Sequence, residues 1–142
     1  MIKQVSIFLE NKEGRLGRVL KILGENNINI RALSIAETAD FGILRLIVNK
    51  PEQALVVLKN AGFLVSETDV LAIEVPDTPG GLAATLEPLA ESEINIEYMY
   101  AFLAKKSDNA IVIFRVEDSK KAIEVLNSIG LQVLSGETIY SL

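Results

Sequence analysis

The chain has 142 residues, a formal net charge of −5 from 14 basic and 19 acidic side chains, and no histidine, cysteine or tryptophan. These absences exclude thiol and imidazole nucleophiles, His-based triads, disulfides and zinc fingers. The composition still permits a carboxylate site for a hard cation, but we expect neither a cofactor nor a metal centre. The acidic balance argues against a nucleic-acid partner. No apolar run approaches the roughly 18 residues of a membrane span, and the opening residues do not resemble a signal peptide, so we expect a cytoplasmic protein and no membrane partner.

The first half of the chain predicts strands and helices in the order βαββαβ. Branched and aromatic residues from Gln4 to Leu9 predict a strand. After a turn, an apolar stripe at i, i+3, i+4 and i+7 predicts a helix from Leu16 to Leu23. Asn26 and Asn27 end this helix, because asparagine tolerates the left-handed conformation. Strands over 28–35 and 43–48, a helix from Pro51 to Gly62 and a strand over 63–66 complete the set.

The second half repeats the first. A shift of 66 positions places Gly14 on Gly80 and the triplet Ile28-Asn29-Ile30 on Ile94-Asn95-Ile96, and a later shift of 68 places Gly62 on Gly130. We therefore predict two repeats, 1–68 and 69–142, with a boundary near Thr68. The second repeat should contain strands over 70–75, 94–102, 110–116 and 131–134 and helices over 79–92 and 119–129. This order predicts an α+β fold of two ferredoxin-like units, each an antiparallel sheet with both helices on one face.

The segment Asp77-Thr78-Pro79-Gly80-Gly81-Leu82 is the first candidate for chemistry. Thr78 can cap the following helix, Pro79 suits its first turn, and the glycines let another group approach the backbone. A helix N-terminus can hold a carboxylate, while Asp77 or Asn11 beside it can take an ammonium group. Together these features describe a receptor for an amino-acid zwitterion. The alternative is an ordinary, well-capped helix start.

The second candidate is the asparagine that both repeats carry between two isoleucines, Asn29 and Asn95. Because the isoleucines pack one face of a strand, we expect each asparagine to project to the other face. A repeated amide can offer a donor and an acceptor to a ligand that bridges two units. The alternative is a solvated strand position or a turn amide.

The motif Asp-x-Pro-Gly-x-Leu, a helix of about three turns and Ile-Asn-Ile entering a strand resemble the ACT domain, a small-molecule-sensing module of amino-acid metabolism. The resemblance covers both repeats, as in stand-alone tandem-ACT proteins. It implies side-by-side pairing into an eight-stranded sheet, with an amino acid bound where the loop after strand one meets strand two of the partner unit. By position, it implies ligand-binding roles for Asn11, Gly14, Arg15, Leu16, Asn29, Asp77, Gly80, Gly81, Leu82 and Asn95. The first repeat departs from the motif, with Glu13 in place of the proline and Asn11 in place of the aspartate.

The two repeats differ in charge. Residues 1–69 carry nine basic and eight acidic side chains, a net charge of +1, whereas residues 70–142 carry five and eleven, a net charge of −6. Opposite charge favours pairing of unlike units. We therefore expect a pseudo-symmetric pair with Arg15 near a ligand carboxylate and Asp77 near its ammonium group.

Two short motifs point elsewhere but have weak support. The run from Gly14 to Arg18 contains the G-x-x-G of a KH nucleic-acid clamp, but the topology and charge do not fit. Asp40-Phe41-Gly42 matches a kinase triplet without the other kinase motifs, and is better interpreted as a hairpin turn. Its place near the end of a strand leaves open that Asp40 or Phe41 edges a ligand pocket.

These features favour a non-catalytic amino-acid sensor that forms a homodimer and regulates amino-acid metabolism through a partner, such as a metabolic enzyme. One alternative is an obligate regulatory subunit with a vestigial pocket. Another is a small acyl-phosphate hydrolase on the same fold, in which Arg15 and Asn29 would act on the phosphate. The second repeat has Gly81 at the arginine position, and the first loop lacks a glycine-rich phosphate cradle, which weakens the hydrolase interpretation.

Overall fold

The computed structural model describes residues 1–37, 40–103 and 108–142. The chain divides into two compact units. The first unit comprises residues 3–68 and 139–142, and the second unit comprises residues 1–2 and 69–138. Within the described residues, no helix is long and apolar enough to cross a membrane.

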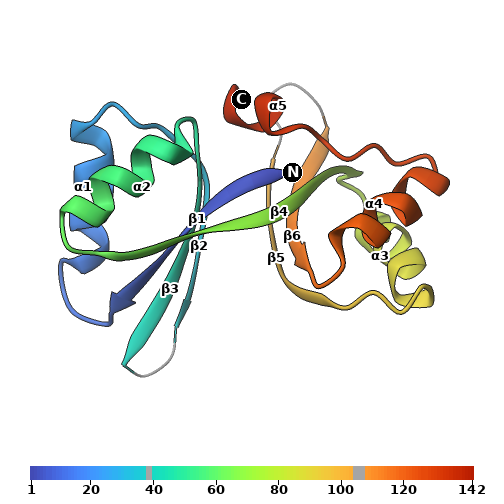
Figure 1. Cartoon of the computed structure of the whole chain (residues 1–142). Helices are drawn as coiled ribbons and strands as arrows, with labels where there is room; N and C mark the ends of the chain where they lie inside the picture. The colour runs from blue at the N-terminus through green and yellow to red at the C-terminus, as the bar shows by residue number, and fades with distance from the viewer. Residues whose placement is uncertain (38–39, 104–107) are drawn as a thin grey trace. The chain divides into compact units, whose positions relative to one another are not determined.

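The first unit has a helical pair on one face of its strands (Figure 1). In its sheet, β3 lies between β1 and β2 and is antiparallel to both, with Leu44 opposite Ile7 on one side and Ile35 on the other. The strand order continues from β1 to the beginning of β4. The elements are β1 (Ile2–Glu10), α1 (Arg15–Glu25), β2 (Ile30–Glu37), β3 (Phe41–Val48), α2 (Pro51–Asn60) and β4 (Leu64–Pro76).

The second unit repeats this arrangement with the later part of β4 as its first strand. Here β6 lies between β4 and β5 and is antiparallel to both, so Val112 opposes Ile73 and Ile113 opposes Tyr100. The ferredoxin-like α+β prediction is therefore confirmed. The elements are α3 (Gly81–Glu91), β5 (Ile96–Leu103), β6 (Asn109–Val116), α4 (Ser119–Ser128) and α5 (Gly136–Tyr140).

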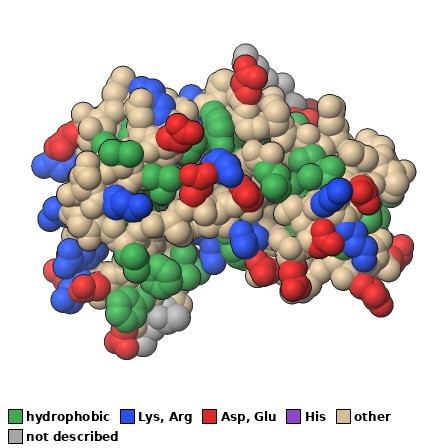
Figure 2. All heavy atoms as spheres, viewed as in Figure 1, with side chains coloured by type: hydrophobic (Ala, Val, Ile, Leu, Met, Phe, Trp, Pro, Cys, Tyr) green, Lys and Arg blue, Asp and Glu red, His purple; other side chains and the backbone are tan. Residues whose placement is uncertain are grey.

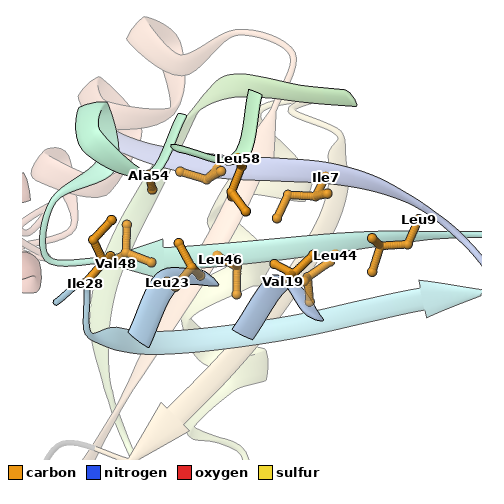
Figure 3. Close-up of a cluster of buried hydrophobic side chains, with 11 residues drawn as sticks. Ile7, Leu9, Val19, Leu23, Ile28, Leu44, Leu46, Val48, Ala54 and Leu58 are labelled. Carbon is orange, nitrogen blue, oxygen red and sulfur yellow. The ribbon is translucent and has the colours of Figure 1, made fainter. Parts of the chain in front are cut away.

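Each unit has its own hydrophobic core between the strands and the two helices. In the first unit, alternate residues of β1 and β3 face the apolar stripes of α1 and α2 (Figure 3). The period of two in the strands and of 3.6 in the helices produces this packing. The second core is built in the same way, with Leu89 at the position that Leu23 occupies in the first.

The repeat is also present in the backbone conformation. All six described residues with a clearly positive φ form three pairs of repeat equivalents: Gly14 and Gly80, Asn27 and Glu93, and Gly62 and Gly130. The first pair precedes a helix, and the other two pairs follow one. The expected left-handed helix end at Asn27 is therefore confirmed, and Gly62, which was expected to end its helix, is left-handed as well.

Two predicted strand boundaries were wrong. The strands expected over 63–66 and 70–75 form one continuous strand, β4, because no glycine, proline or turn sequence interrupts residues 64–75. The strand expected over 131–134 is reduced to one bridge, between Val133 and Ile73. The chain then enters α5, whose first turn is capped by the Ser135 hydroxyl, which accepts a hydrogen bond from the Thr138 N–H at 3.1 Å.

The predicted start of α3 was also wrong. The helix begins at Gly81, after the left-handed residue Gly80, and Thr78 is not its cap. Instead, the Thr78 carbonyl accepts the Gly81 N–H at 3.0 Å, which closes a turn over 78–81. Pro79 therefore lies in this turn and not in the helix.

Candidate functional site

The turn between β1 and α1 is fixed by backbone hydrogen bonds. The Lys12 N–H donates to the Glu10 carbonyl at 2.8 Å, and the Asn11 N–H donates to the Asp40 carbonyl at 3.0 Å. Gly14, with a φ of 81°, then turns the chain into α1, so that Arg15 is the first helical residue. The first N–H groups of a helix have no partner within it and carry partial positive charge. The turn therefore places Arg15 beside backbone groups suited to an anion.

A small cleft of about 110 Å³ opens at this turn, and we call it the head cleft. It brings together Asn11, Arg15 and Leu16, three of the residues singled out in the sequence. The end of β2 adds Ile35 and Glu37. The complete lining is Leu9, Glu10, Asn11, Lys12, Arg15, Leu16, Ile35, Glu37 and Gly42. The cleft thus combines cationic, anionic, amide and apolar groups in a space too small for most drug-sized ligands.

Three charged side chains interact at the head cleft. The Glu10 Oε2 lies 2.9 Å from the Lys12 Nζ and 3.9 Å from the Arg15 Nη2. The hydrogen bond and charge of Lys12, followed by the charge of Arg15, lower the pKa of the Glu10 carboxyl. Glu10 is therefore ionised at neutral pH and lies against Arg15 at the cleft wall.

A larger cleft of about 250 Å³ shares Leu9, Glu10 and Arg15 with the head cleft, and we call it the aromatic cleft. Its remaining lining residues are Phe8, Phe41, Gly62, Phe63 and Leu64. Figure 2 shows hydrophobic side chains gathered around the end of the β2–β3 hairpin, where the aromatic cleft begins at Phe41. Sequence reasoning left open that Phe41 edges a pocket, but missed Phe8, Phe63 and Leu64. The available signal was Phe8, which occupies a β1 position between the core residues Ile7 and Leu9 and so faces away from the core.

Asn29 lies outside both clefts. It precedes β2, and its backbone pairs with Asn49: the Asn29 N–H donates to the Asn49 Oδ1 at 2.9 Å, and the Asn29 carbonyl accepts the Asn49 N–H at 3.0 Å. The head cleft takes Ile35 and Glu37 from the other end of β2. The expectation that Asn29 projects from within a strand was therefore wrong, and the first unit does not bring it to Arg15.

The corresponding turn of the second unit is built differently. Asp77, Gly80 and Leu82 are exposed there. Gly81 occupies the position of Arg15, but a Cβ at Gly81 would collide with the Pro76 carbonyl oxygen. The start of α3 therefore packs too closely on the end of β4 for any side chain at this position.

Asn95 lines a separate, open hollow of about 640 Å³ in the second unit. Like Asn29, it lies just before its strand, so it does not project from within β5 as expected. The hollow also contains Asp118, which caps α4 by accepting the Lys121 N–H at 3.1 Å. The described residues include no group of three or more acidic side chains that could hold a metal ion.

A family model described as an ACT domain pair matches residues 1–142. The chain belongs to the ACT domain family. Among solved structures, protein BT0572 from Bacteroides thetaiotaomicron is 46% identical, with a TM-score of 0.94 over 99% of this chain and 96% of that one. A search of curated proteins finds no match.

Two more distant structures share the fold of this ACT pair. The ligand-free regulatory subunit of aspartate kinase from Thermus thermophilus is 16% identical, with a TM-score of 0.66 over 89% of this chain and 91% of that one. The corresponding subunit from Thermus flavus is 15% identical, with a TM-score of 0.63 over 89% and 90%. At this level of identity, the similarity concerns the fold alone.

Proposed function

We propose that this ACT pair is a non-catalytic sensor that binds a free amino acid and regulates amino-acid metabolism through a partner protein. The observation that carries the proposal is the head cleft, where Arg15 and the N-terminus of α1 lie in one concavity with Glu37 and Asn11. An amino-acid zwitterion carries both charges on one carbon, so it needs anion-binding and cation-binding groups a few ångströms apart.

The cleft residues divide by charge into two roles. The Arg15 guanidinium and the N-terminus of α1 receive the ligand carboxylate, because guanidinium groups and helix N-termini both favour anions. Glu37 and the Asn11 side-chain oxygen take the ammonium group. Glu10 already has two cationic neighbours, so it orients Arg15 and does not bind the ammonium group. Gly14 provides the backbone turn on which Arg15 depends.

The second unit also belongs to the proposed ligand-binding site. Its proposed ligand-binding residues are Asp77, Gly80, Gly81, Leu82 and Asn95. The family resemblance assigns these positions to the ligand, with Asp77 near the ammonium group. However, the second unit lacks a counterpart of Arg15, and its turn has no room for one. We therefore propose that the first unit provides the main contacts to the ligand carboxylate.

Hydrolysis of an acyl phosphate is a weaker candidate. It would need the Arg15 guanidinium and the Asn29 amide to meet at one phosphate group. Asn29 lines neither cleft, and its backbone is held by Asn49 before β2 begins. This arrangement favours binding without catalysis.

The regulatory part of the proposal rests on linkage. A ligand that binds one conformation better than another shifts the population, and a partner that distinguishes the two conformations responds to the shift. The fold shared with regulatory subunits of aspartate kinase supports a partner enzyme on a separate chain. We also propose that the chain is cytoplasmic and forms a homodimer. Light scattering of the purified chain would test the dimer.

A thermal-shift panel of the twenty amino acids tests the sensor directly. A ligand at 100 times its dissociation constant stabilises the folded chain by about 2.7 kcal/mol, so a true ligand raises the melting temperature measurably. Arg15→Gln should abolish the response. Lys21→Gln is the matched control, because Lys21 also belongs to α1 but forms an exposed ion pair with Glu25 and lines neither cleft.

The outcome separates the sensor from the alternative regulatory subunit. If no amino acid at millimolar concentration stabilises the chain, the sensor proposal is wrong for this chain alone, and a subunit with a vestigial pocket becomes the better interpretation. If Arg15→Gln and Lys21→Gln respond alike to a stabilising amino acid, the ligand binds elsewhere and the assignment of the head cleft fails.

A further inference from the structure

The aromatic cleft exposes large apolar side chains that the core of the first unit does not use. The exposed fractions are 51% for Phe8, 53% for Phe41 and 70% for Leu64. All three line the same cleft of about 250 Å³. Single exposed hydrophobic residues are common on protein surfaces, but a concave cluster of them marks a binding surface.

The second unit provides an internal comparison, because its strand register identifies the equivalent positions. Phe8 lies opposite Ile43 in the first unit as Glu74 lies opposite Ile111 in the second, so Glu74 is the equivalent of Phe8. In the same way, Phe41 lies opposite Glu10 and Asn109 lies opposite Pro76, so Asn109 is the equivalent of Phe41. The sequence repeat places Gln132 at the position of Leu64. A glutamate, an asparagine and a glutamine thus replace the three exposed apolar residues. The fold itself does not require apolar side chains there, so their presence in the first unit needs another explanation.

The aromatic cleft and the head cleft meet at Arg15. Leu9, Glu10 and Arg15 line both, so a molecule held by its carboxylate at Arg15 can extend from the head cleft into the aromatic cleft. Phe63 forms part of the apolar wall, and the Arg18 guanidinium lies over its ring, 5.7 Å from the ring centre. The charge at Arg15 and the apolar surface beyond it are complementary to an anionic group attached to an apolar body.

We propose that the aromatic cleft binds the side chain of the sensed amino acid, so that the ligand is an amino acid with a large apolar side chain. This inference rests on the proposed function and specifies its ligand class. The head cleft holds the charged groups of the ligand and the aromatic cleft selects its side chain. Small and acidic amino acids bind less tightly, because they leave the apolar surface in contact with water or place a charge against it.

Calorimetric titration of the full chain with leucine, phenylalanine, glycine and aspartate measures this selectivity. We expect leucine or phenylalanine to bind at least about tenfold more tightly than glycine, the factor that burial of a few methylene groups provides. Phe8→Glu and Leu64→Gln, which introduce the residues of the second repeat, should weaken leucine or phenylalanine binding about tenfold more than they weaken glycine binding.

Val56→Glu is the matched control. Val56 is 57% exposed, lies on α2 outside both clefts, and has Glu124 as its repeat equivalent. The control should bind every amino acid as the unmodified chain does.

A second measurement, of tryptophan fluorescence, uses the absence of tryptophan from the sequence. Leu64→Trp places a single tryptophan at the aromatic cleft, and its emission should shift to shorter wavelength when the apolar ligand binds.

Three results would overturn the inference. Equal affinity for glycine and leucine would show that no side-chain subsite exists. Unchanged selectivity in Phe8→Glu and Leu64→Gln would place the subsite elsewhere. A change of oligomeric state in Phe8→Glu with unchanged selectivity would show that the cleft contacts a second copy of the chain. The proposed function fails in a different way, through the lack of a response to any amino acid, glycine included.

Discussion

The Glu10 carboxylate lies 3.9 Å from the Arg15 guanidinium, so the last residue of β1 forms an ion pair with the first residue of α1 across the intervening turn. Both residues line the head cleft and the aromatic cleft. The pair therefore places the Glu10 carboxylate beside the cation that we assign to the ligand carboxylate. Its contribution to stability depends on the charge of Glu10.

Glu10→Gln should make the chain less stable at neutral pH but not in acid. The neighbouring cations lower the pKa of Glu10 in the folded chain. A lowered pKa stabilises the folded state above the unfolded pKa, and this stabilisation disappears as the pH falls through the lowered value. Urea unfolding of both chains at pH 7 and about pH 3 measures the difference, which we expect to be small because the pair is exposed. A difference that persists unchanged in acid would contradict the assignment to Glu10 ionisation.

Gly81→Ala should destabilise the second unit, because the added Cβ would collide with the Pro76 carbonyl oxygen, a backbone atom that cannot rotate away. We expect a loss of about 1–3 kcal/mol in the free energy of unfolding. Gly17→Ala is the control: Gly17 lies within α1, and its added Cβ would meet no atom within 4 Å. That change should stabilise the chain by about 0.5–1 kcal/mol. Equal effects of the two substitutions would refute the steric argument.

Much of the fold follows from local patterns in the sequence. The stripe that places Val19 and Leu23 in the core has the helical period, and the alternation of Ile7 and Leu9 has the strand period. The repeat then transfers each assignment from one half to the other. The break expected between the strands over 63–66 and 70–75 was wrong because it came from the repeat alone, whereas the residues between them continue to favour a strand.

The clefts were harder to predict, because they depend on tertiary structure. Arg15 and Asn11 are near each other in sequence, so the loop motif was enough to identify them. Phe8, Phe41 and Leu64 come from three different strands, and only the folded sheet places them around one cleft. Asn29 was singled out by the Ile-Asn-Ile triplet but lines neither cleft. The triplet gave no indication of its backbone pairing with Asn49.

Residues 139–142 belong to the first unit, although they lie at the end of the second repeat in sequence. The Tyr140 hydroxyl accepts the Lys3 N–H at 2.7 Å, and the Tyr140 carbonyl accepts the Arg31 Nε–H at 2.9 Å. Tyr140→Phe removes only the first of these hydrogen bonds and should cost about 1 kcal/mol of stability. Amide hydrogen exchange at Lys3 should become faster, and unchanged protection at Lys3 would show that the hydrogen bond has no role in solution.

Leu23→Ala and Leu89→Ala test whether the two repeats are separate folding domains, as the boundary prediction of 1–68 and 69–142 requires. The two leucines are repeat equivalents, and both are fully buried, in different cores. Each substitution should cost about 2–5 kcal/mol, because it leaves a cavity in a packed core. Hydrogen exchange resolved by peptide should then show faster opening in 3–68 for Leu23→Ala and in 69–138 for Leu89→Ala. If either substitution instead accelerates exchange equally in both regions, the two repeats are not separate folding domains and the chain opens as one cooperative unit. Ligand binding at the head cleft would then stabilise the second repeat as strongly as the first.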